Sequence, residues 1–84
     1  MITAAEREKM LAVHMCGERV VERLASIGVR RLAELRGRDP WDLMHAINLE
    51  AGRPIWRPPM AIIALQNLID ASEREGTNPP ARRA

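Results

Sequence analysis

The chain has 84 residues, which suits one small domain that buries only about 60% of the surface its unfolded chain exposes. Phe and Tyr are absent, so aliphatic residues and methionine must fill the core, and the one cysteine excludes a disulfide within the chain. The net charge of +2 and the sequence pI near 9.5 modestly favour anionic partners.

The first predicted helix begins after Thr3. Thr3 stands three residues before Glu6, which is the spacing of a capping box at a helix N-terminus. Met10 and Val13 then supply an apolar edge to this segment. We expect the helix to end near His14.

The second predicted helix follows Gly17, which is an acceptable N-cap residue. Apolar residues at positions 20, 24 and 27 fall on one face of a helix, and charged residues take the opposite face. Gly28 follows the last of them and is expected to adopt the left-handed conformation that ends many helices. This segment is therefore predicted to be an amphipathic helix.

Two further helices are predicted before residue 52. Leucines at positions 32 and 35 indicate a short third helix, which is ended by Gly37. Asp39 and Pro40 form a strong start for a fourth helix, because Asp can cap it and Pro suits its first position. Gly52 is expected to close this fourth helix.

The last predicted helix opens at Pro58 and Pro59 and is apolar around more than half of its circumference. It is therefore expected to be the central packing element of an all-α fold. Gly76 is expected to stop it, which gives a domain over residues 1–76 and a disordered tail over residues 77–84. No window shows the alternation typical of a strand.

The segment GERVVERLASIGVRRLAELRGRDPWDLMHAI, followed by a break that contains proline and an apolar last helix, resembles one family. This family comprises the small bacterial helix-hairpin-helix proteins called pathogenicity locus or mitomycin resistance protein-like. The resemblance implies a compact bundle of about five helices with one helix-hairpin-helix motif, similar to sterile-alpha-motif domains and to the N-terminal domains of some repair polymerases.

The hairpin pattern of such motifs is matched in part. Gly17 matches the second glycine, Cys16 the apolar residue before it, and Arg19 the basic position. Met15 replaces the first glycine, although a side chain disfavours positive φ and close approach of the backbone to a phosphate. Glu18 replaces the usual proline and places a carboxylate near the expected anion.

Weak, sequence-independent binding of double-stranded DNA through backbone phosphates is the first functional prediction. Residues 14–38 contain six arginines and three glutamates, so positive charge is concentrated near the hairpin. Each arginine could also belong to an ordinary solvated surface, since Glu22 lies within reach of Arg19 on a helix. The predicted nucleic-acid contacts are Cys16, Gly17, Arg19, Arg23, Arg30 and Arg31.

The alternative prediction is a protein-interaction module, in which the bundle is kept and the phosphate site is lost. An exposed apolar patch formed by Met44, Trp56 and Met60 would support a homodimer or another protein partner. Trp56 could instead seal the core beneath its loop, which is the safer expectation in a domain with so few large residues.

Catalysis, cofactors and metals are not expected. No hydroxyl side chain neighbours a histidine in a known motif, and His14, Cys16 and His45 are too few soft ligands for zinc. No signal peptide is evident, and the longest apolar run, residues 60–65, is too short to cross a membrane. We therefore expect a cytoplasmic protein that does not bind membranes.

Overall fold

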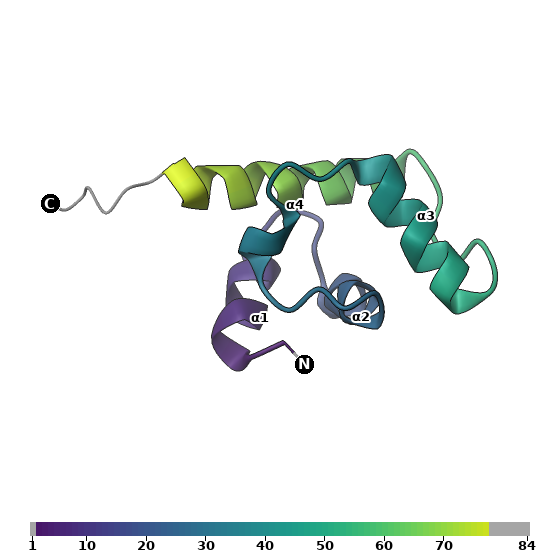
Figure 1. The fold of residues 1–84 in the computed structure, drawn as a ribbon, viewed down its shortest axis with the longest axis horizontal. Coiled ribbons are helices and arrows are strands. Elements are labelled where there is room, and N and C mark those ends of the chain that lie inside the picture. The colour runs from purple at the N-terminus through teal and green to yellow at the C-terminus, as the bar shows by residue number, and fades with distance from the viewer. Residues whose placement is uncertain (1, 78–84) are drawn as a thin grey trace, which may run out of the picture.

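A computed structural model describes residues 2–77 of the chain, which fold into four α-helices and one short 3-10 helix (Figure 1). The elements are α1 (Ala4–Leu11), α2 (Glu18–Ser26), η1 (Leu32–Leu35), α3 (Pro40–Ala51) and α4 (Met60–Thr77). No strand occurs in residues 2–77, which confirms the all-α prediction for this part of the chain. Residues 78–84 of the predicted tail lie outside the described residues.

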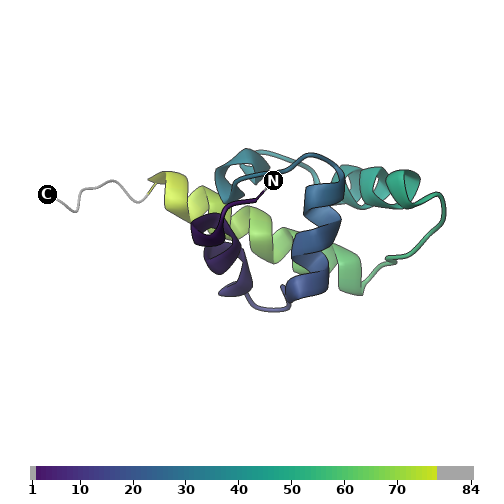
Figure 2. The same ribbon diagram turned by 90° about the horizontal axis from the view of Figure 1, so that it is seen from below.

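Helix α4 is the longest element, and the rest of the fold is built on it. Figures 1 and 2 show α1, η1 and α2 on one side of α4, with α3 packed near the first turns of α4. Leu65 and Leu68 of α4 are completely buried and belong to the same core cluster as Leu35 of η1 and Leu43 of α3. The prediction that the last helix is the central packing element is therefore confirmed.

Several predicted helix ends are confirmed. The Thr3 hydroxyl oxygen accepts a hydrogen bond from the backbone N–H of Glu6 (3.2 Å), and the Asp39 carboxylate accepts one from Trp41 (2.8 Å). Gly28 follows α2 with φ +86°, and Gly52 caps α3 with φ +79°. These conformations suit glycine, because a Cβ atom disfavours the left-handed region.

Three details of the helix prediction were wrong. The first helix ends at Leu11 and not near His14, because the chain turns after Ala12 and Val13 donates to the carbonyl of Met10. The predicted third helix is only a 3-10 helix, so the structure has four α-helices where about five were expected. Its four residues lie between two turns, a length at which i to i+3 hydrogen bonds are common.

The third error concerns the end of the last helix. Helix α4 continues through Gly76 to Thr77, so this glycine does not end it. A glycine inside a helix costs only about 1 kcal/mol relative to alanine, which is too little to stop a helix by itself.

Glu6 joins α1 to the neighbouring elements. Its carboxylate accepts a hydrogen bond from the backbone N–H of Leu32 in η1 (2.9 Å) and pairs with Lys9 (3.0 Å). Lys9 also pairs with Glu75 of α4 (2.8 Å). Thus the carboxylate of the predicted capping box holds η1 in place.

Glu6→Gln should make the protein less stable at neutral pH and less sensitive to acid. The Leu32 N–H bond and the Lys9 charge lower the pKa of Glu6 below its usual 4.5, against the opposing effect of burial. A lowered folded-state pKa contributes stability above the unfolded-state pKa, and this stability is lost as pH falls through the folded-state value. We expect a loss of about 1 kcal/mol in urea unfolding at pH 7 that vanishes in strong acid. A gap of equal size at every pH would contradict this role.

Candidate nucleic-acid interface

The turn between α1 and α2 keeps a left-handed residue without a glycine. Met15 has φ +70°, although its position is the one at which the hairpin pattern has its first glycine. Its side chain packs partly buried against the core, and the Asn67 side chain donates to the carbonyl of His14 (3.1 Å). Packing and this bond to α4 therefore hold the turn in a conformation that methionine alone disfavours.

Cys16 and Gly17 occupy different environments in this turn. Cys16 is buried, burial raises the pKa of its thiol to about 11, and its backbone N–H already donates to Val13 (3.1 Å). Gly17 is exposed and is the N-cap of α2. Cys16 therefore offers neither its side chain nor its N–H to a ligand.

The Glu18 carboxylate in the first turn of α2 is engaged within the protein. It forms an ion pair with Arg7 of α1. This pairing draws the carboxylate toward α1 and offsets part of its charge, but it also keeps an acidic group at the N-terminus of α2. The surface further along α2 is more favourable to an anion.

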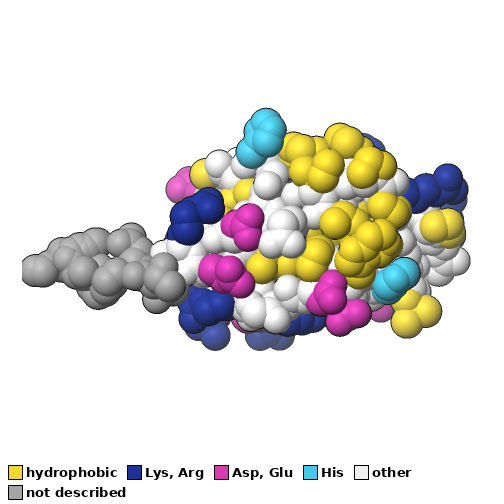
Figure 3. All heavy atoms as spheres, turned by 90° about the horizontal axis from the view of Figure 1, so that it is seen from above, with side chains coloured by type: hydrophobic (Ala, Val, Ile, Leu, Met, Phe, Trp, Pro, Cys, Tyr) yellow, Lys and Arg dark blue, Asp and Glu magenta, His cyan; other side chains and the backbone are white. Residues whose placement is uncertain are grey.

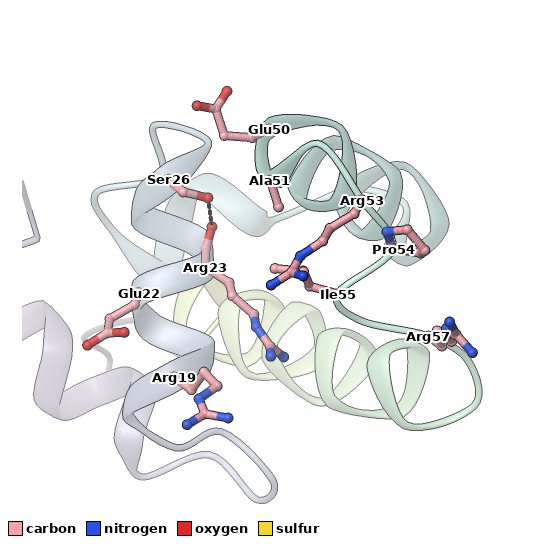
Figure 4. A pocket seen from close by; sticks show the side chains of 10 residues that line it. All are labelled: Arg19, Glu22, Arg23, Ser26, Glu50, Ala51, Arg53, Pro54, Ile55 and Arg57. Carbon is pink, nitrogen blue, oxygen red and sulfur yellow. Dashed lines mark hydrogen bonds between the residues drawn. The ribbon is translucent and has the colours of Figure 1, made fainter.

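Four arginines line a hollow of about 890 Å³ between α2 and the loop of residues 52–59 that joins α3 to α4. We call this hollow the arginine cleft; its arginines are Arg19, Arg23, Arg53 and Arg57. Figure 4 shows the side chains of Arg19, Arg23 and Arg53 converging on the cleft, while Arg57 points outward at its edge. The cleft therefore brings together cations from two distant parts of the sequence.

The arginine cleft has no internal counter-charge. Within residues 2–77, none of its four arginines forms an ion pair. Glu22 and Glu50 lie at the rim, and Figure 4 shows both carboxylates pointing away from the arginines. The pairing of Arg19 with Glu22 that their spacing allowed is thus not formed. Unpaired guanidinium groups facing one hollow favour an anionic ligand.

Arg23 is the most restrained of the four arginines. Its guanidinium carbon lies 4.9 Å from the centre of the Trp56 ring, within the range of a cation–π interaction. Burial, together with the nearby charge of Arg19, lowers the pKa of Arg23. A bound anion would relieve the repulsion between the two arginines, while the Trp56 ring keeps the Arg23 side chain oriented.

Trp56 itself is held by Asn48 of α3. The Asn48 amide donates to the Trp56 carbonyl (2.8 Å), and the Trp56 N–H donates to the Asn48 side-chain oxygen (3.0 Å). Trp56 is only 9% exposed, which confirms the expectation that it seals the core. Asn48 therefore fixes the loop that supplies Arg53 and Arg57.

The predicted site residues do not all lie together. Arg19 and Arg23 line the arginine cleft, whereas Arg30 and Arg31 are exposed beyond the other end of α2 and do not line it. Arg31 lies 3.7 Å from Glu34. Sequence reasoning missed Arg53, Arg57 and Asn48. The repeated Arg-Pro pairs at 53–54 and 57–58 were the available signal.

Other kinds of site find no support in the described part of the chain. Residues 2–77 contain no cluster of three or more potential metal ligands and no helix with the length and apolar character needed to span a membrane. Comparison of the chain with protein-family models, curated proteins and solved structures gave no match.

Proposed function

We propose that this chain is a non-catalytic module that binds DNA without sequence specificity through the backbone phosphates. The observation that carries the proposal is the arginine cleft, where Arg19, Arg23 and Arg53 converge without a carboxylate partner. The resemblance to helix-hairpin-helix proteins supports the same function, but it shifts the main contact from the hairpin to the cleft.

Phosphate is the anion that best suits this surface. Guanidinium groups donate paired N–H groups in a fixed plane, which matches two oxygens of one phosphate. Phosphate contacts also position a protein on DNA without reading its sequence. A single cleft with a few arginines is therefore expected to bind DNA weakly and with little sequence preference.

Fluorescence anisotropy of a labelled DNA titrated with the protein at several salt concentrations tests this function. Each phosphate neutralised by the protein releases counterions, so log K should fall linearly with log salt, with a slope of about −0.9 per contact on duplex DNA. We expect a slope that corresponds to about two to four contacts. The absence of binding at low salt would refute the proposal.

A protein-interaction function is the second candidate. The apolar patch first expected is not present, because Met44 and Trp56 are buried and only Met60 is exposed. Trp41 and Ile63 are about half exposed, at 47% and 44%, and Figure 3 shows hydrophobic side chains gathered on the face over α4 and α3. Such a surface favours a partner. Sedimentation of the protein at increasing concentration would detect self-association, and Ile63→Asp should abolish it.

A further inference from the structure

A second hollow lies against the same loop as the arginine cleft. Its volume is about 710 Å³, and its walls include Met44, Leu49, Trp56 and Pro58. We call it the apolar cleft, because these side chains make most of its surface hydrophobic. The apolar cleft and the arginine cleft both include Arg53 and Arg57 in their linings.

Trp56 connects the two hollows. Arg23 of the arginine cleft lies over its ring, and Trp56 is also part of the wall of the apolar cleft. A ligand that occupies both hollows must therefore have negative charge beside Arg53 and Arg57 and an uncharged, largely apolar group next to it. A nucleotide has this composition, because its base is attached through the sugar to a phosphate.

We propose that the apolar cleft accepts an unpaired base of a DNA strand whose phosphates are bound by Arg53, Arg57 and the rest of the arginine cleft. This inference rests on the proposed function. It predicts a preference for single-stranded DNA, because the bases of a duplex are stacked and paired and cannot enter a side cleft unless the duplex is opened.

The row of arginines distinguishes a DNA strand from other ligands that are both apolar and acidic. Arg57 and Arg53 lie on the loop, and Arg23 and Arg19 continue along α2 (Figure 4). A polynucleotide presents phosphates at regular intervals on either side of each base. One base in the apolar cleft therefore leaves its neighbouring phosphates within the region that the arginines cover.

The test compares three labelled DNA probes by fluorescence anisotropy at fixed low salt. They are a thymidine oligonucleotide, an abasic strand with the same number of phosphates, and a duplex of the same length. We expect the thymidine strand to bind about fivefold to tenfold more tightly than the abasic strand, at the lower end of what contact with a base contributes in single-strand binding proteins. The duplex should bind no better than the abasic strand.

Variants at exposed apolar positions locate the effect. Leu49 lines the apolar cleft and is 84% exposed, so Leu49→Asn should leave the fold intact. This variant should lose affinity for the thymidine strand and keep its affinity for the abasic strand. Ile63→Asn is the matched control, because Ile63 is an exposed apolar residue that lines neither hollow, and it should change neither affinity.

The outcomes separate this inference from the proposed function. If no probe binds, both are refuted. If all three probes bind equally well, phosphate binding stands and the base site is refuted. If Leu49→Asn and Ile63→Asn weaken thymidine binding equally, the apolar cleft is not where the base binds.

Discussion

Replacing Arg19 and Arg23 together with alanine should weaken DNA binding about 10-fold to 100-fold at low salt, given about 1 kcal/mol or more for each charge-assisted contact. The salt slope should fall by about 2, since two phosphate contacts are removed. Neither arginine forms an ion pair, and α2 packs through its valines and Leu24, so the unfolding midpoint should change little. Anisotropy titrations at several salt concentrations measure both quantities.

The matched control is the double change Arg30→Ala with Arg31→Ala. It removes the same amount of charge from two exposed positions outside the arginine cleft. We expect it to lower affinity only slightly, through the change in net charge. Equal losses in the two double variants would mean that net charge alone attracts DNA and that the cleft has no special role.

Asn48→Ala should destabilise the protein by about 2–3 kcal/mol, a large fraction of the stability of a small domain. The change removes both hydrogen bonds to Trp56 and leaves the N–H and carbonyl of that residue without these partners. In a Trp41→Phe background the fluorescence reports on Trp56 alone, and its emission should shift toward that of exposed tryptophan. Urea unfolding gives the change in free energy.

The same variant should bind DNA more weakly under conditions in which it is folded. The loop would no longer hold Arg53 in place or keep Trp56 beneath Arg23. Glu50→Ala is the control, because Glu50 is an exposed neighbour on α3 whose carboxylate points away from the arginines (Figure 4). Unchanged affinity and emission in folded Asn48→Ala would show that the clamp does not position the cleft.

Local rules predicted much of the fold because the ends of helices depend on nearby residues. Thr3, Asp39, Gly28 and Gly52 act at the positions that capping preferences indicate. Those rules were less reliable where tertiary contacts decide the conformation. Met15 adopts a positive φ in a turn that packing and Asn67 hold in place, which no local preference would suggest.

The candidate site was only half predictable for a related reason. Arg19 and Arg23 share a helical face, so their proximity follows from the helix period. Arg53 joins them through the packing of α3 against α2 and the path of the following loop, which depend on contacts distant in sequence. Asn48 stands eight residues before Trp56, and its spacing matches no helical or turn pattern that would reveal the clamp.

The most direct test of the arginine cleft is an NMR titration of the ¹⁵N-labelled protein with a thymidine oligonucleotide, observing the arginine side-chain N–H groups and the tryptophan indoles. We predict that the largest shifts occur at Arg19, Arg23 and Arg53 and at the Trp56 indole, while the Trp41 indole stays unchanged. Shifts confined to the exposed surface around Trp41 and Ile63, or to Arg30 and Arg31, would contradict binding in the cleft.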